Sequence, residues 1–229
     1  MQILLFDIDG TLIRSGGAGK AAMEEALRSE FGLVQIQDGI KYSGRTDPSI
    51  LHDLLTVHNL EPSDENVERL KAAYLRLLPS CLGRVQGIVL PGILSLLNRL
   101  MLADTVAVGL LTGNVRDGAR HKLNHFGLWH YFAFGGFADG INDRDDVARK
   151  ALVETVGHLG RDVDPRNVWV IGDTPLDVKC ARAIGARAVA VATGWNSVEE
   201  LTEAKADWVM SDLQDPNELL DAWGIAKAG

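Results

Sequence analysis

The chain has 229 residues, of which 46% are hydrophobic, which is enough material for a large α/β domain or for a core with a smaller second unit. Its formal net charge of −8 at pH 7 disfavours non-specific attraction to nucleic acid or to an anionic membrane surface. The two cysteines lack metal-site spacing, no segment resembles a signal peptide and no apolar run could span a bilayer, so we expect a cytoplasmic protein.

The first predicted element is a short buried strand, Ile3 to Phe6, which runs directly into Asp7 and Asp9. Ligands of open α/β sheets bind at the carboxyl ends of the strands, so we expect both carboxylates at that edge. Two like charges this close repel each other unless they share a cation or a proton. The pair alone fits a metal site or a solvated turn, and the rest of the chain must decide between them.

The next region, from residue 18 to about 84, shows helical periodicity and contains no convincing strand. Small residues in 15–19 and 83–87 can absorb the dihedral changes of a hinge at both ends of the region. We therefore predict a helical domain over residues 16–85, inserted into a core of residues 1–15 and 86–229. The segment 44–47 interrupts the helices, and it is either a helix N-cap ahead of Pro48 or a substrate contact through Arg45.

After this insertion, strand-like and helical patterns alternate, which is typical of a doubly wound, Rossmann-like α/β core with a parallel sheet. Strands are predicted over 106–111, 168–171, 188–191 and 208–210. Helices are predicted near 92–102, 115–125, 146–159, 176–184 and 197–205. With the first strand, the predicted sheet has about five strands.

Two of these strands end in residues that could perform chemistry. Thr112-Gly113-Asn114 places a hydroxyl and free backbone N–H groups before a helix, where a phosphate would fit, although the same residues also make ordinary turns. Asp173 stands at the end of its strand and Asp177 follows one helical turn later, so both can face one cation. Either carboxylate could also simply cap the helix.

Together, the segments 7–11, 111–114 and 172–177 closely resemble the signature of the haloacid dehalogenase superfamily. The chain is most similar in style to the phosphoglycolate phosphatase-like branch, which carries a helical cap after the first motif. The resemblance implies a Mg²⁺-dependent hydrolase that acts on a small phosphate monoester through an aspartyl-phosphate. It implies that Asp7 is the nucleophile, Asp9 the general acid and base, and Thr112 a ligand of the phosphoryl group.

The resemblance also implies the remaining ligands of the site. Mg²⁺ would be held by Asp7, by Asp9 through its backbone carbonyl and by Asp173, with Asp177 supporting the metal or a basic residue. The expected substrate-binding residues are Gly10, Thr11, Gly113 and Asn114 from the motifs and Arg45 from the insertion. An aspartate at position 9 favours phosphate esters, because the dehalogenases and phosphonate-cleaving relatives lack it.

The family's basic residue departs here from its usual form, because the common Lys-Pro pair is absent. The helix that leads into the strand at Val168 must begin at the carboxyl edge of the sheet, so Arg144 at its start is expected near the site. Lys150 would lie about 9 Å farther along the helix at 1.5 Å per residue. We therefore predict that Arg144, rather than Lys150, steadies the nucleophile.

Two other functions stay open on the sequence. A sugar phosphomutase of the same superfamily would share Asp7, Asp9 and the metal set, and would differ in keeping its intermediate from water. A non-catalytic regulatory protein could retain the fold, because a fold by itself does not confer activity. The intact set of acidic residues argues against the second.

Overall fold

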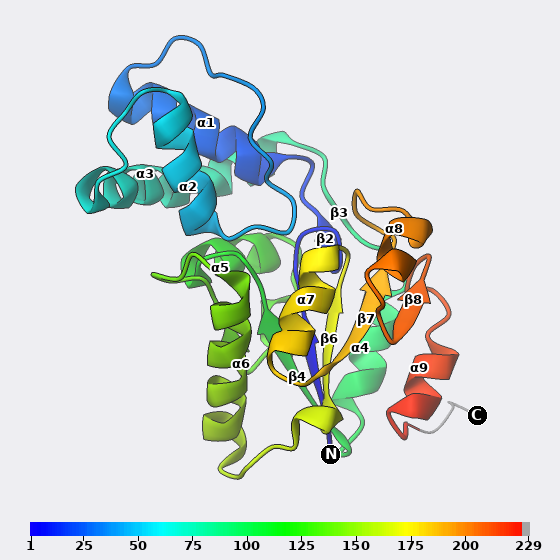
Figure 1. Cartoon of the computed structure of the whole chain (residues 1–229). Helices are drawn as coiled ribbons and strands as arrows, with labels where there is room; N and C mark the ends of the chain where they lie inside the picture. The colour runs from blue at the N-terminus through cyan, green and yellow to red at the C-terminus, as the bar shows by residue number, and fades with distance from the viewer. Residues whose placement is uncertain (226–229) are drawn as a thin grey trace.

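The computed structural model describes residues 1–225 and shows a six-stranded sheet with three helices above its carboxyl edge (Figure 1). The strand order is β5-β4-β1-β6-β7-β8, and every pairing in the sheet is parallel. The strands are β1 (Gln2–Phe6), β4 (Val106–Leu111), β5 (Gly135–Gly136), β6 (Val168–Gly172), β7 (Arg187–Val191) and β8 (Trp208–Met210). The central position of β1 places the residues that follow it in the middle of the edge.

Helices cover both faces of the sheet, as a parallel sheet requires. The flanking helices are α4 (Ile93–Met101), α5 (Arg116–His125), α6 (Arg144–Leu159), α7 (Pro175–Ala183), α8 (Val198–Glu203) and α9 (Asn217–Ala222). Leu4 and Phe6 of β1 belong to a core shared with α4, α5 and α9, whereas Ile3 and Leu5 face α6, α7 and α8. The alternation of side chains along one strand therefore supplies both halves of the core.

The predicted doubly wound α/β core is confirmed, and all five predicted strands are present. The strand β5 was not predicted, because two consecutive glycines have no β-propensity to detect. Also not predicted were α9, the one-turn 3₁₀ helices η1 (Trp129–Tyr131) and η2 (Pro165–Asn167), and a small antiparallel pair, β2 (Ile13–Arg14) with β3 (Ile88–Val89). This pair joins the two chain segments that connect the sheet to the inserted helices.

The inserted region consists of α1 (Ala18–Phe31), α2 (Asp47–Val57) and α3 (Asp64–Arg84). These helices pack around their own apolar core, which includes Met23, Leu54 and Tyr74. This cluster also takes in Val115, just before α5, so the inserted helices pack against the core at that point. In the described part of the chain, no helix combines the length and apolar character needed to cross a membrane.

Candidate active site

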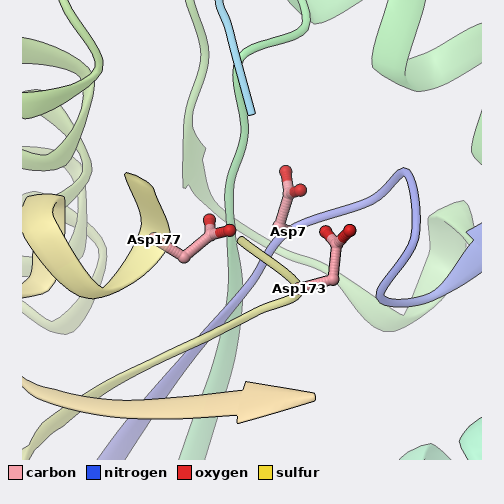
Figure 2. Close-up of side chains that lie close together, drawn as sticks. All are labelled: Asp7, Asp173 and Asp177. Atoms are coloured by element: carbon pink, nitrogen blue, oxygen red, sulfur yellow. The ribbon is translucent and has the colours of Figure 1, made fainter. Parts of the chain in front are cut away.

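Three buried carboxylates meet at the carboxyl edge of the sheet, directly above β1 and β6 (Figure 2). Asp7 follows β1, while Asp173 follows β6 and Asp177 lies in the first turn of α7. They come together because β1 and β6 are paired neighbours in the sheet. One oxygen from each carboxylate lies within 4.8 Å of the others, and no residue in this acidic cluster is more than 5% exposed.

Burial and mutual repulsion make these carboxylates hard to ionise. Burial is the main reason that the pKa of Asp7 rises to about 6, and the charges of Asp177 and Asp9 add to it, whereas Arg144 opposes it. For Asp173, burial and the charges of Asp177 and Asp7 raise the pKa to about 8. The acidic cluster therefore favours the uptake of a proton or a cation.

The guanidinium of Arg144 lies between two of these carboxylates. Arg144 is the first residue of α6 and is buried. Its Nη2 lies 3.2 Å from Oδ1 of Asp7 and also donates to Oδ1 of Asp177. Lys150 lies six residues farther along α6, is partly exposed and makes none of these contacts. The helix thus begins where the sequence placed it, and Arg144 is the residue that meets Asp7.

Asp177 is already bound through both of its oxygens. Its Oδ1 accepts from Arg144, while Oδ2 accepts from the backbone N and the hydroxyl of Thr174, at 3.0 and 2.8 Å, in a capping box. Asp7 and Asp173 are the members of the acidic cluster with oxygens left for a cation. Hard, partly buried carboxylate oxygens of this kind are the ligands that Mg²⁺ takes in proteins, so the donor set fits this ion.

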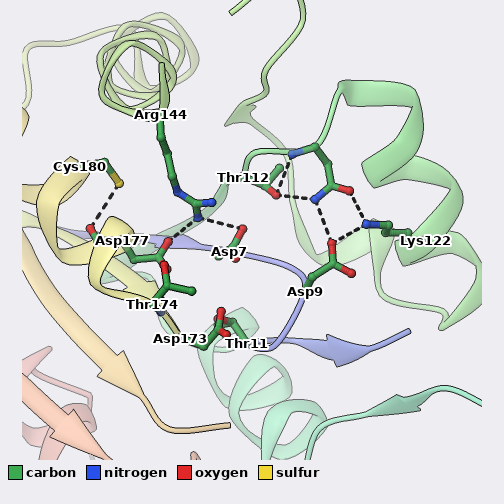
Figure 3. A network of polar contacts seen from close by, with 11 residues as sticks. Asp7, Asp9, Thr11, Thr112, Lys122, Arg144, Asp173, Thr174, Asp177 and Cys180 are labelled. Carbon is green, nitrogen blue, oxygen red and sulfur yellow. Dashed lines mark hydrogen bonds and ion pairs between the residues drawn. The ribbon is translucent and has the colours of Figure 1, made fainter. Parts of the chain in front are cut away.

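A second polar network lies beside the acidic cluster and joins Asp9 to α5 (Figure 3). Oδ2 of Asp9 accepts from Nζ of Lys122 and from Nδ2 of Asn114, the latter at 3.0 Å. The same Nδ2 lies 2.9 Å from Oγ1 of Thr112, and Oδ1 of Asn114 accepts from Lys122 at 2.5 Å. Ser15 donates to the other oxygen of Asp9 at 3.3 Å. Asp9 therefore points toward α5 and not into the acidic cluster.

Lys122 was not among the predicted site residues, and its side chain is buried at the end of this network. Burial opposes its charge, but the carboxylates of Asp9 and Asp47 outweigh this effect and raise the pKa of Lys122. Burial likewise opposes ionisation of Asp9, but Lys122 and Asn114 lower the pKa of that carboxyl. The sequence holds only a weak signal for Lys122, since the helical spacing places this residue on the same face as the small residues Gly118 and Ala119, one turn earlier.

Two glycines of the motifs are required by the close approach of other groups. Gly10 has a φ of +87°, and a Cβ there would overlap the carboxylate of Asp173. A Cβ on Gly113 would overlap the carbonyl oxygen of Arg45. Thr11, another predicted substrate ligand, instead directs its hydroxyl at Oδ1 of Asp173, at 3.4 Å. Gly10 and Thr11 thus shape the acidic cluster from the side of the first motif.

The turn before α2 joins the helical insertion to the core. The backbone N of Asp47 donates to the carbonyl of Gly113 at 2.6 Å, and Oδ2 of Asp47 accepts from the backbone N of Val115 at 2.9 Å. The hydroxyl of Thr46 donates to the carbonyl of Asn142 at 2.8 Å and also accepts from the N-terminal turn of α2. Thr46 is therefore the N-cap of α2, while Asp47 binds across to the core.

Arg45 belongs to the same turn, but its guanidinium is bound within the insertion. Nη1 lies 2.7 Å from Oδ2 of Asp53, and the guanidinium also donates to the carbonyls of Lys41 and Ser49 at 3.4 and 3.2 Å. It is the backbone of Arg45 that lies against Gly113. The structure thus brings the Arg45 backbone, and not its charge, to the loop that carries Thr112.

Comparison with known proteins gives a consistent set of relatives. A model of the haloacid dehalogenase-like hydrolases matches residues 4–182. Phosphoglycolate phosphatase of Synechococcus elongatus is 30% identical over 227 residues, covering 97% of each chain. A hydrolase from Pseudomonas syringae has a TM-score of 0.72 at 25% identity, covering 97% of this chain and 99% of that one. CbbY from Rhodobacter sphaeroides, solved in complex with phosphate, shares the fold, with a TM-score of 0.77 at 17% identity over 95% of this chain and 96% of its own.

Proposed function

The chain belongs to the haloacid dehalogenase-like hydrolases, and on this basis we propose that it is a Mg²⁺-dependent phosphatase of small phosphate monoesters. The observation that carries the proposal is the juxtaposition of Asp7 with Arg144 and Asp173 at the buried edge of the sheet. A carboxylate held against a guanidinium and next to a cation site can approach a negatively charged phosphate, which an isolated carboxylate would repel.

In the first step, an oxygen of Asp7 attacks the phosphorus, and the bond between phosphorus and the ester oxygen breaks. The leaving oxygen takes a proton from Asp9, which must acquire that proton against the pKa-lowering effect of Lys122 before the ester bond breaks. The alcohol then departs neutral and an aspartyl-phosphate remains on Asp7. The hydroxyl of Thr112, fully buried beside Asn114, donates to the phosphoryl oxygens. Arg144 keeps Asp7 oriented in both steps, because its own position is fixed by the ion pair with Asp177 of α7.

In the second step, Asp9 is a carboxylate and removes a proton from water. The water oxygen attacks the phosphorus, the bond to Asp7 breaks, and inorganic phosphate leaves with both carboxyl groups restored. One residue can serve both steps because its protonation alternates between them. The network of Lys122 and Asn114 around Asp9 would hold that carboxyl near the reacting atoms in each step.

Bound Mg²⁺ would supply positive charge that offsets the charge developing on the phosphoryl oxygens. Asp7 and Asp173 would hold it, together with the backbone carbonyl of Asp9, since the side chain of Asp9 faces Lys122. Asp177 would support this arrangement through Arg144 and Thr174.

The helical insertion, residues 16–85, would act as a cap over the site. Its turn at Gly44–Asp47 packs on the loop that carries Thr112, and opening of that contact would admit the substrate. Closure would exclude bulk water and select the group that leaves. The similarity to a phosphoglycolate phosphatase favours a small, acidic phosphate ester such as 2-phosphoglycolate as the first substrate to examine.

A screen of the purified protein against phosphate esters tests the proposal. We expect release of inorganic phosphate from at least one small alkyl ester with Mg²⁺, and loss of that activity in excess chelator and in Asp7→Asn. A phosphomutase would instead convert hexose 1-phosphate to hexose 6-phosphate with little free phosphate. A regulatory protein would release phosphate from none of the esters, and either result would overturn the proposal.

A further inference from the structure

The ammonium group of Lys122 is in an unusual setting for a lysine, because it is buried at the junction of the core and the helical insertion. The residue is 4% exposed, and its ammonium contacts Oδ2 of Asp9 and Oδ1 of Asn114. Gly19 of α1 packs over it, such that a Cβ on that glycine would lie 3.5 Å from Nζ. Burying an ammonium is costly unless it is paired, so its partners define what it can do.

Those partners form a chain that links the groups proposed to touch the substrate. Lys122 contacts both Asp9 and Asn114, and Asn114 in turn reaches Thr112 at 2.9 Å. Thr112 follows β4, Asp9 follows β1, and Lys122 is held by α5, so three separate elements are tied together. Oδ2 of Asp9 receives two donors from this network, which restricts rotation of its carboxyl group.

We propose that Lys122 is a positioning residue for Asp9, which it holds, together with Asn114, at the distance from Thr112 that the leaving oxygen requires. This inference rests on the proposed phosphatase function and adds a residue to it. The distance matters because a proton donor misplaced by about 1 Å can cost on the order of 10²-fold in rate. Without the lysine, Asp9 would keep Asn114 and Ser15 as partners but would lose the charged donor to Oδ2, so its carboxyl group would be held less firmly.

The role predicts a dependence on the leaving group that a purely structural lysine would not show. An alkyl phosphate needs a proton on its departing oxygen, whereas 2,4-dinitrophenyl phosphate releases a stable anion that needs none. The ratio kcat/KM reports the step in which the ester bond breaks and is insensitive to hydrolysis of the aspartyl-phosphate. Loss of Asp9 positioning therefore affects kcat/KM for the alkyl ester and spares the aryl ester.

The test is Lys122→Met, which keeps much of the side-chain volume and removes the charge. We expect kcat/KM to fall about 10²-fold for the best alkyl phosphate and less than about fivefold for 2,4-dinitrophenyl phosphate. In the Asp9→Asn background, Lys122→Met should cause no further loss on the alkyl ester, because the residue it positions is already disabled. Arg120→Met is the matched control, since it removes an exposed cation from the same helix, and it should leave both ratios unchanged.

Equal losses on the two esters, or a further loss in the Asp9→Asn background, would overturn the positioning role while leaving the phosphatase function intact. A wild-type protein that hydrolyses neither ester with Mg²⁺ would overturn both. If circular dichroism shows that Lys122→Met does not fold, Ser15→Ala replaces it. That variant removes the donor to the other oxygen of Asp9 and must show a selective loss on the alkyl ester.

Discussion

Replacing Asp7 by asparagine should abolish turnover and yet stabilise the metal-free protein. The pKa of Asp7 is raised from 3.8 to about 6, chiefly by burial. At about 1.4 kcal/mol per pKa unit, keeping this group ionised at pH 8 costs the folded chain about 3 kcal/mol. Asp7→Asn removes that cost, and in a chain of this size each kcal/mol corresponds to about 2–4 °C in Tm, so Tm should rise by about 6–12 °C.

The pH dependence follows from the sign of this difference. Because the folded chain holds the Asp7 proton more tightly than the unfolded chain, the wild-type apo protein loses stability as the pH rises from about 4 to about 6. The gain in stability from Asp7→Asn at pH 5 should therefore be roughly half of the gain at pH 8. The pKa of Asp173 is raised to about 8, so ionisation of Asp173 continues to lower the stability of the folded chain up to about that pH, in the wild type and in Asp7→Asn.

Thermal unfolding in excess chelator at pH 5 and pH 8 measures this directly, with phosphate release measured on the same samples. Asp38→Asn serves as the control, since Asp38 has a side chain 96% exposed, and it should shift Tm little at either pH. Added Mg²⁺ should stabilise the wild type more than Asp7→Asn, because the variant lacks one charged ligand. A variant that melts at or below the wild-type temperature at pH 8 in chelator would refute the electrostatic reasoning.

Four further variants test the surroundings of the acidic cluster. Arg144→Ala should lower turnover by about 10²-fold or more, whereas Lys150→Ala should have little effect. Steady-state kinetics with the same ester measure both, and a larger loss of turnover in Lys150→Ala would contradict the assignment. Arg45→Ala is expected to affect kcat/KM for the best alkyl ester and for 4-nitrophenyl phosphate to the same extent, because Asp53 holds the Arg45 guanidinium within the insertion, and a loss confined to the alkyl ester would instead make Arg45 a substrate contact. Asp47→Ala should raise KM and speed proteolysis between α1 and α2, because Val115 loses its partner from the insertion. An unchanged rate of proteolysis would show that Asp47 does not stabilise the contact between the insertion and the core.

The sequence was sufficient to predict the core, because a parallel sheet leaves strong local signals. Each predicted strand is an apolar run, and in β1 and β6 it ends in an aspartate, so the meeting of Asp7 with Asp173 followed from the sheet geometry alone. The position of Arg144 followed from the same rule, because a helix that precedes a parallel strand must begin at the carboxyl edge. β5 left no signal, because its pairing comes from the place of Gly135–Gly136 beside β4.

Lys122 and Asp47 were harder to predict for a shared physical reason. A lysine on an amphipathic helix usually extends into solvent, and only the partners that the fold brings to it explain its burial. Asp47 stands where a residue would cap its own helix, but Thr46 takes that place and Asp47 instead binds Val115, 68 positions away along the chain. Contacts between the insertion and the core depend on how two separately packed units meet, which local periodicity does not encode.

The central claim, that Asp7 carries the phosphoryl group, is tested most directly in the Asp9→Asn variant with 2,4-dinitrophenyl phosphate and Mg²⁺. The aryl ester needs no acid, so phosphoryl transfer to Asp7 should proceed, while hydrolysis should stall without its base. We predict a burst of about one equivalent of dinitrophenolate per protein chain, and a phosphoryl group on residue 7 in peptide mass spectra after acid quench. Steady release of dinitrophenolate without a burst and with no phosphoryl group at residue 7, or phosphorylation of a different residue, would contradict the account.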